Sequence, residues 1–212
     1  ILLCVITEEV HSSQIIDYEA EKFIYELIDE VKIANNIDKN FNIKIIQDEN
    51  INAFVDQNNI IYITSALIEN CDDYIALLSV IAHEIGHIDN NHIDKRILKK
   101  NNLNNINTFT NLSLIASSLL FNNTEFTKGI FLSGSRLSEN NLNFSKDQER
   151  EADYYSLETL KKLNLYSNSI INLLLEIEKK SLEKGFTKEN LKYSTHPYFD
   201  ERIDIIKYLN NN

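Results

Sequence analysis

The sequence predicts an α+β fold that is mostly helical, with a small antiparallel sheet early in the chain. Three short stretches with β-type alternation fall together between residues 41 and 64, and long segments with helical periodicity lie on either side. The 212 residues include only four Gly and one Pro, which leaves little room for a turn-rich all-β fold. We therefore expect one domain over residues 1–212, with an N-terminal helical segment at 1–40, the sheet at 41–64 and a helical part at 65–212.

The N-terminal segment is expected to contain one amphipathic helix. Ser12 or Ser13 can cap its start, and the helix should end near Ala34. Its apolar residues recur at helical spacing on one face: Ile16, Ala20, Phe23, Ile24, Leu27 and Val31. Glu and Asp residues fill the other side of this helix, so that side should face solvent.

The predicted strands cover residues 41–45, 51–55 and 60–64. The first alternates apolar and polar residues, as a strand with one solvated face should. The last two flank Asp-Gln-Asn-Asn at residues 56–59, and Asn and Asp tolerate the left-handed backbone of a tight turn, so we expect a hairpin. The edge of the strand at 60–64 could bind an extended peptide by main-chain hydrogen bonds, or the hairpin could only cover the helices.

The rest of the chain is predicted to be helical. A helix capped by Asp72 or Asp73 should reach about Leu98. Further helices are predicted at 105–121, 125–138, 146–164, 168–184 and 199–210.

Charge and hydropathy exclude two classes of partner. The formal net charge is −11, whereas a partner with a phosphate backbone would require a basic patch, so we expect no nucleic acid. The longest apolar candidate, residues 112–121, is shorter than the roughly 18 to 20 apolar residues that span a bilayer, so we expect no membrane span.

The two cysteines, Cys4 and Cys71, are too few for a disulfide framework or a four-thiolate zinc site. The apolar run before Cys4 could be the tail of a signal sequence that ends at a lipid-modified cysteine, which makes Cys4 a possible lipid anchor. Leu3 stands where such sites normally have a small residue, and the alternative is an N-terminal strand or the start of a helix. Cys71 is expected to be an isolated core thiol.

The strongest chemical signal is the HExxH motif His83-Glu84-Ile85-Gly86-His87, which lies inside a strongly periodic helix. Residues four apart share a face of an α-helix, so His83 and His87 can bind one Zn²⁺ ion per chain. Glu84 lies beside them and could act as the general base that takes a proton from water. The apolar residues around the motif predict a buried helix, where unpaired His and Glu would be costly. The alternative is a pair of core histidines satisfied by hydrogen bonds.

A catalytic zinc site needs a third protein ligand, and the acidic sequence Glu-Arg-Glu-Ala-Asp at residues 149–153 can supply it. Glu149 and Asp153 are four apart and project from one face, whereas Glu151 points roughly the opposite way. We predict that Glu149 is the third ligand and that Asp153 accepts the remaining N–H of a ligand histidine, His83. The alternative is a solvated acidic helix face. Four small residues would allow the two helices to approach closely: Ala82, Gly86, Ala152 and Ser156.

The remaining histidines are weighed separately. A site of the HExxHxxGxxH type needs a Gly where this chain has Asn90, and His92 falls one residue short of its third histidine. His92 is therefore predicted to be a surface or packing residue on the same helix. His196, before Pro197, could stabilise the oxyanion of the transition state or cap the zinc in a resting state, and the alternative is a local turn histidine. Two tyrosines are weaker oxyanion candidates: Tyr193 and Tyr198.

Four motifs occur in order along the chain: Asn52-Ala53-Phe54, the helix segment at 81–87, the acidic segment at 149–153, and Thr195-His196-Pro197 followed by Arg202. Together they resemble the gluzincin metallopeptidases related to HtpX and the CAAX prenyl proteases, especially their soluble bacterial members of the cell envelope. The resemblance covers most of the chain, from about residue 43 to residue 209. Residues 56–59 depart from it, because the family usually has a Gly-rich turn there.

The resemblance implies a zincin-like fold and a defined set of site residues. Zinc would be bound by His83, His87 and Glu149, with Glu84 as the base. The resemblance also implies that Asp153 lies behind one of the ligands and that His196 and Arg202 lie near the site.

The resemblance also implies a function. It suggests a zinc metalloendopeptidase that cleaves polypeptides, including misfolded envelope proteins, in protein quality control of the cell envelope. A cytoplasmic location is the alternative. Three rival functions remain open: a chaperone-like or binding module with an occluded zinc site, a scaffold that uses the metal only for stability, and an enzyme that hydrolyses a non-peptide amide.

Overall fold

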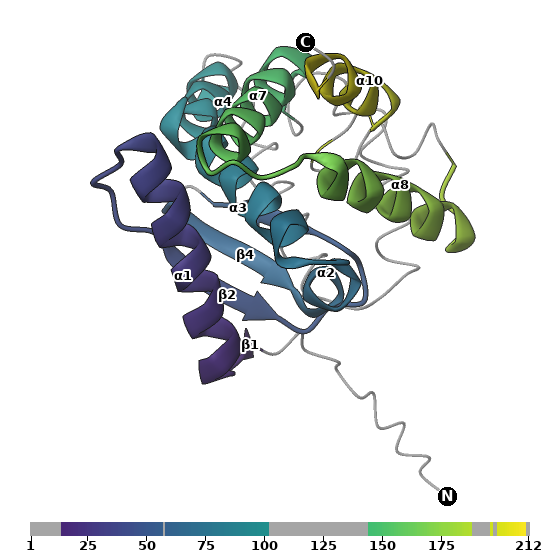
Figure 1. Cartoon of the computed structure of the whole chain (residues 1–212), viewed down its shortest axis with the longest axis horizontal. Helices are drawn as coiled ribbons and strands as arrows, with labels where there is room; N and C mark the ends of the chain where they lie inside the picture. The colour runs from purple at the N-terminus through teal and green to yellow at the C-terminus, as the bar shows by residue number, and fades with distance from the viewer. Residues whose placement is uncertain (1–13, 57, 102–143, 188–195, 197–198, 211–212) are drawn as a thin grey trace, which may run out of the picture.

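A computed structural model describes residues 14–56, 58–101, 144–187, 196 and 199–210. The described part is an α+β fold that is mostly helical. Helices α1 and α3 lie against the sheet, and α7, α8 and α10 form a second layer beyond α3 (Figure 1). The elements are, in order, β1 (Gln14–Ile15), α1 (Tyr18–Asn35), β2 (Asn42–Ile46), β3 (Ala53–Val55), β4 (Ile60–Thr64), α2 (Ser65–Asn70), α3 (Tyr74–Asp89), α4 (His92–Asn101), α7 (Lys146–Lys162), α8 (Asn168–Glu183) and α10 (Phe199–Asn210).

The sheet is mixed, which corrects the antiparallel prediction. Its strand order is β1-β2-β4-β3, with β1 antiparallel to β2, β2 parallel to β4, and β3 antiparallel to β4. The hairpin of β3 and β4 is present as expected. Strand β2 pairs with the side of β4 that faces away from β3. Alternation along each segment predicts a strand but not its neighbour, and this is why the sequence could not distinguish the two arrangements.

The same strand order moves the expected edge for peptide binding. Strand β4 lies between β2 and β3, so neither of its sides is free. Among the described strands, β3 forms the edge on this side of the sheet. One face of the sheet is buried under α1 and α3 through alternating residues of three strands: Ile43, Ile45, Ala53, Val55, Ile61 and Ile63.

Helix α1 begins later than predicted. The Asp17 carboxylate accepts hydrogen bonds from the backbone N–H groups of Glu19 and Ala20, at 3.1 Å each, and so caps the helix. The proposed caps Ser12 and Ser13 lie outside the described residues. Ile16 precedes the helix and is 86% exposed, so it does not belong to the buried face. That face consists of Ile24, Leu27, Ile28 and Val31.

The turn of the hairpin is built around an acidic residue, as its Asp- and Asn-rich sequence predicts. The Asp56 carboxylate accepts hydrogen bonds from the N–H of Asn58 at 2.8 Å and of Ile60 at 3.0 Å. Asn59 adopts a left-handed conformation with φ of 58°. Side-chain acceptors and a left-handed Asn therefore form this turn without glycine.

Helix α3 is capped by Asp73, whose carboxylate accepts from the N–H of Ala76 at 2.9 Å. It ends at Asp89 and does not continue to Leu98 as predicted. Asn91 adopts a left-handed conformation with φ of 54°, which breaks the helix before α4 starts at His92. This break redirects His92, as described below.

The predicted helices at 146–164, 168–184 and 199–210 are confirmed by α7, α8 and α10. Those predicted at 105–121 and 125–138 lie outside the described residues, as does Cys4. Among the described helices, none is long and apolar enough to cross a bilayer. Burial raises the pKa of the Cys71 thiol to about 12, so this cysteine remains an unreactive thiol.

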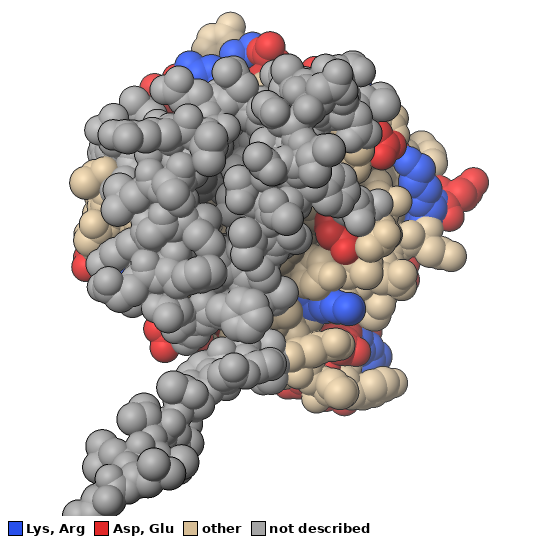
Figure 2. Space-filling view, turned by 180° about the vertical axis from the view of Figure 1, so that it is seen from behind, with Lys and Arg blue, Asp and Glu red and all other residues tan. Residues whose placement is uncertain are grey.

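Figure 2 shows the molecule from behind. On the described part of this face, basic and acidic side chains lie interspersed, and no large basic patch gathers among them. This distribution agrees with the formal net charge of −11.

Candidate metal centre

The candidate site lies where α3 and α7 pack against each other. A Cβ atom built on Gly86 would lie 3.0 Å from Cβ of Tyr155 and 3.3 Å from Cα of Ala152, so only glycine permits this approach without a shift. Ser156 donates a hydrogen bond from Oγ to the carbonyl of Ser79 at 2.8 Å, which ties the two helices together. The predicted close approach of small residues is therefore present.

Four buried or nearly buried side chains point at one another here. Nε2 of His83 lies 3.0 Å from Nε2 of His87. Of the Glu149 carboxylate, Oε2 lies 3.6 Å from Nε2 of His83 and Oε1 lies 3.6 Å from Nε2 of His87. His196 completes the group, and one potential ligand atom from each of the four lies within 4.8 Å of all the others. The structure thus brings together the three predicted ligands and His196.

The other ring nitrogen of His83 is held by Asp153. Nδ1 of His83 lies 2.9 Å from Oδ1 of Asp153, and Arg202 donates to both oxygens of that carboxylate at 2.7 and 2.8 Å. Burial raises the pKa of Asp153, but Arg202 and His83 outweigh burial and hold it well below its usual range. Asp153 is therefore ionised and accepts the Nδ1–H of His83, which leaves Nε2 as an acceptor.

The other ring nitrogen of His87 is held by His92. Nδ1 of His87 lies 3.0 Å from Nδ1 of His92, whose Nε2 lies 2.9 Å from Oε2 of Glu151. His92 is completely buried, so its predicted place on the surface of a continuous helix is wrong, although it does pack in the core. Glu151, predicted to point away from the ligands, does so, and there it meets His92.

These contacts test whether the residues fit a metal ion. Burial lowers the pKa of His87 well below its usual value, and the neighbouring histidines and Arg202 lower it further, so this imidazole is neutral. The two Nε2 atoms lie 3.0 Å apart, and the Nδ1 atom of each ring is in contact with another side chain behind it. Two imidazole nitrogens and a carboxylate that converge in a buried site are ligands of the types that zinc prefers, so this donor set fits Zn²⁺.

The carboxylates of the site lie beside two basic side chains, His196 and Arg202. Burial raises the pKa of Glu149, but His196 and Arg202 outweigh burial and lower it. Burial lowers the pKa of His196, but Glu84 and Glu149 outweigh burial and raise it. Glu84 and Glu149 thus form an acidic environment that favours positive charge at the site.

Glu84 and His196 face each other across the site. Nε2 of His196 lies 3.2 Å from Oε1 of Glu84, and its Nδ1 lies 3.2 Å from Oε1 of Glu149. Oε2 of Glu84 is buried and has no hydrogen-bond partner among the described residues. The two tyrosines considered as oxyanion candidates, Tyr193 and Tyr198, lie outside the described residues.

Two contacts of His87 were missed by sequence reasoning. The ring of Phe144 stacks on His87 with centroids 3.7 Å apart and an interplanar angle of 20°. An isolated apolar residue just before a helix gives no signal of such a role. The contact with His92 had a signal, a histidine five residues after His87, but a continuous helix would have turned it to another face.

The fold and the site are those of a metallopeptidase of the HExxH type, in which Glu149 of a second helix lies beside the two histidines of the motif. The family model of peptidase family M48 matches residues 17–210, and the chain belongs to this family. This confirms the predicted family resemblance and the predicted class of enzyme, a zinc metallopeptidase.

The chain is similar to two curated bacterial proteins that are named as proteases. It is 24% identical over 176 residues to a protein of Vibrio cholerae whose name is given provisionally as beta-barrel assembly-enhancing protease, a match that covers 82% of this chain and 35% of that protein. It is 26% identical over 172 residues to the beta-barrel assembly-enhancing protease of Yersinia pestis, covering 80% of this chain and 34% of the relative. The chain thus spans about a third of the length of these relatives.

Proposed function

We propose that this chain is a zinc metalloendopeptidase in which His83, His87 and Glu149 bind one zinc ion. The observation that carries this proposal is the pair of Nε2 atoms 3.0 Å apart, each on a ring whose Nδ1 is already held by another side chain. A structural zinc site would favour a closed shell rich in cysteine, and it would have no use for a buried glutamate beside the ligands. A non-peptide amide would use the same residues, and only substrate assays separate the two reactions.

Glu84 is the proposed general base. When bound in such a site, zinc lowers the pKa of a water and polarises the scissile carbonyl. Glu84 is 1% exposed and stands next to His83 in the sequence, so its carboxylate is held at the site and can take the proton of the attacking water. The same carboxylate then delivers this proton to the leaving amine. No covalent intermediate with the enzyme is needed.

Asp153 and Arg202 are the proposed support of this chemistry. By holding the proton of His83 on Nδ1, Asp153 keeps Nε2 free as a ligand atom. Arg202 neutralises Asp153 and also lies 3.3 Å from Oε2 of Glu149. Arg202 therefore holds Glu149, the proposed third ligand, and Asp153, which supports His83, in position together.

His196 has two candidate roles. Its Nδ1 lies 3.3 Å from Nε2 of His83 and 3.2 Å from Glu149, which is where a fourth ligand would cap the ion. A small displacement would instead let the imidazole donate to the oxyanion of the transition state. The cap geometry also favours the second candidate function, a chaperone-like or binding module with an occluded zinc site.

The substrate is proposed to be a polypeptide bound in extended form along β3. This strand forms an edge of the described sheet, and α3 packs against it, so a peptide paired with β3 would run beside the HExxH helix. The names of the two relatives support a place in quality control of envelope proteins, with misfolded envelope proteins as substrates. A lipid anchor at Cys4 would suit this location.

The test of the enzymatic function is Glu84→Gln. This variant should bind one zinc ion per chain and lose cleavage of an unfolded protein such as casein by on the order of 10²–10⁴-fold, because the general base is removed. A matched control is Glu158→Gln, on the outer side of α7, which should cleave like the wild type. Full activity of Glu84→Gln would remove the mechanism.

His196→Ala separates the roles of His196. If His196 caps the ion, activity should rise; if it stabilises the oxyanion, kcat should fall with little change in KM. If both the wild type and this variant bind zinc but neither cleaves a peptide, the binding module is favoured over the protease.

A further inference from the structure

The proposed mechanism leaves a buried polar pair behind His87 without a role. We propose that His92 and Glu151 are positioning residues that hold His87 in the one tautomer able to bind the metal. This inference rests on the proposed metal site, but it concerns how the protein prepares a ligand in advance.

With both imidazoles neutral, the contacts of the pair allow only one consistent placement of protons. The His92 Nε2 atom lies 2.9 Å from a carboxylate oxygen of Glu151, so Nε2 must carry a hydrogen, because two acceptors at that distance would repel. His92 then has an acceptor at Nδ1, which faces Nδ1 of His87 at 3.0 Å. His87 must therefore carry its hydrogen on Nδ1, and its Nε2 lone pair is directed at His83 and Glu149.

The opposite placement fails at both ends. If His92 carried its hydrogen on Nδ1, its Nε2 lone pair would face the Glu151 carboxylate. His87 would then carry its hydrogen on Nε2, directed at the lone pair of His83, and could not bind the ion. Glu151 thus selects the tautomer of a ligand that it does not touch.

The backbone presents His92 for this contact. The left-handed Asn91 ends the straight course of α3 and returns the chain toward His87. Gln148 of α7 donates a side-chain hydrogen bond to the carbonyl of His92 at 3.3 Å. The His92 ring is 0% exposed and therefore has one orientation.

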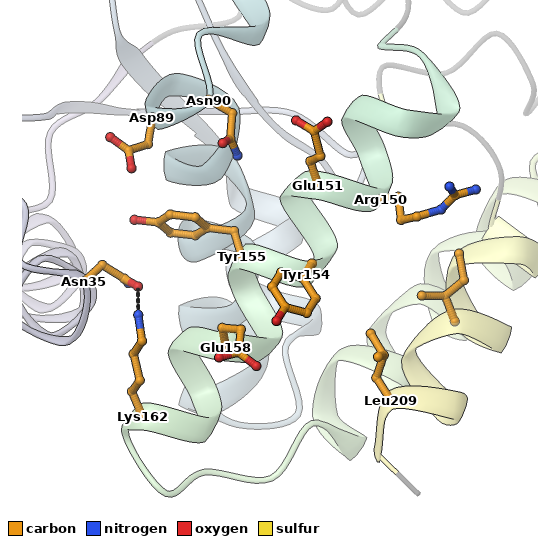
Figure 3. A pocket seen from close by; sticks show the side chains of 11 residues that line it. Asn35, Asp89, Asn90, Arg150, Glu151, Tyr154, Tyr155, Glu158, Lys162 and Leu209 are labelled. Carbon is orange, nitrogen blue, oxygen red and sulfur yellow. Dashed lines mark hydrogen bonds between the residues drawn. The ribbon is translucent and has the colours of Figure 1, made fainter. Parts of the chain in front are cut away.

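Glu151 connects this buried pair to the surface. Its side chain is 54% exposed and lines an outer pocket, where Figure 3 shows it projecting from α7 beside Asn90. Glu158 lines the same pocket about two helical turns further along α7, without a part in the pair. These two carboxylates provide a matched comparison.

The experiment measures zinc affinity by competition with a chromophoric chelator, using the whole chain and Zn²⁺ as the probe. Glu151→Ala should weaken zinc binding about tenfold, at the lower end of the 10–100-fold effect of partners behind a metal ligand. Glu151→Gln should restore most of the affinity, because its amide oxygen can still accept from His92. Glu158→Ala should bind zinc like the wild type. Equal affinity of Glu151→Ala and the wild type would overturn the proposal.

A second measurement separates this inference from the proposed function. In the metal-free protein, ¹⁵N NMR of labelled histidine should show the hydrogen of His87 on Nδ1 in the wild type and a mixture of both tautomers in Glu151→Ala. A wild-type His87 with its hydrogen on Nε2 would overturn the proposal even if zinc binds. If no zinc binds at all, the metal site fails, and the tautomer of His87 still decides whether the positioning pair exists.

Discussion

The two histidines of the HExxH helix are supported from opposite sides by different chemistry. Behind His83 stands a buried carboxylate, Asp153, which requires the buried cation Arg202 to offset the cost of its desolvation. Behind His87 stands a neutral imidazole, His92, and the carboxylate that orients it lies at the surface. Both rings need an acceptor for an Nδ1–H. For His83 the acceptor belongs to a buried ion pair, and for His87 it is a neutral imidazole.

The comparison suggests that the two sides differ in what they contribute to the protein. The Asp153 side should matter for the stability of the fold as well as for the metal, because removing one buried charge leaves the other unpaired. The His92 side should matter mainly for the metal, because Glu151 is already hydrated. The following changes test this difference, from the largest expected effect to the smallest.

Arg202→Leu should lower the free energy of unfolding of the metal-free protein by about 3 kcal/mol, because Asp153 is then buried without its partner. Urea denaturation measures this change. Arg150→Leu is the control, since that arginine lies on α7 with a side chain that is 55% exposed, and it should cost no more than about 0.5 kcal/mol. Equal losses in the two variants would mean that the Asp153 side contributes no special stability.

Asp153→Asn should cost about 2 kcal/mol of unfolding free energy at neutral pH, because hydrogen bonds to a charged group are lost. The pKa of Asp153 is lower in the folded than in the unfolded protein, so its ionised form stabilises the fold above about pH 4. This contribution is lost as the pH falls from there toward the folded pKa. Denaturation of metal-free protein between pH 7 and pH 3 should show the variant approaching the wild type, and a constant difference would contradict the ionised state.

Asn91→Ala should cost about 1 kcal/mol, because alanine is disfavoured in the left-handed conformation, and it should also weaken zinc binding through His92. Asn91→Gly should keep both properties. Asn164→Ala provides a matched control, since Asn164 is also left-handed, with φ of 57°, but follows the far end of α7. It should lose similar stability and keep its zinc affinity, and a parallel loss of affinity would point to a general effect of destabilisation.

Salt should produce the smallest effect, a change of about a factor of two in the effect of Glu151→Ala on zinc affinity. Raising the ionic strength screens exposed charges more than buried ones, so the ratio of zinc affinities between wild type and Glu151→Ala should shrink. The ratio between wild type and Asp153→Asn should stay constant, because that side chain is 1% exposed. Chelator competition at low and high salt measures both ratios.

Much of this site could be predicted from spacing within single helices. The pairs His83 with His87, and Glu149 with Asp153, are each four residues apart, so helical periodicity alone places each pair on one face. Chemistry then suggests that the two faces meet around a metal ion, and the structure brings these faces together. Their roles as ligands and partners stay predictions until the metal is measured.

The predictions that were wrong concern either the residue at which a helix ends or the strand that lies beside another strand. The sheet was expected to be antiparallel because strand alternation carries no information about neighbours, whereas β2 and β4 pair in parallel. His92 was assigned to a continuous helix because nothing local marks Asn91 as left-handed. Asn tolerates the left-handed conformation without requiring it, and the packing of the surrounding elements selects this conformation at Asn91.

The linear chain therefore specified helices α1, α7, α8 and α10, the hairpin, and the residue types on the HExxH face and on the face of α7 opposite it, because these follow from periodicity and residue type over a few turns. The order of the strands and the contact between His87 and His92 arose only when the elements packed. Both depend on the direction in which the chain leaves one element and enters the next, which long-range packing selects among several local conformations of similar free energy.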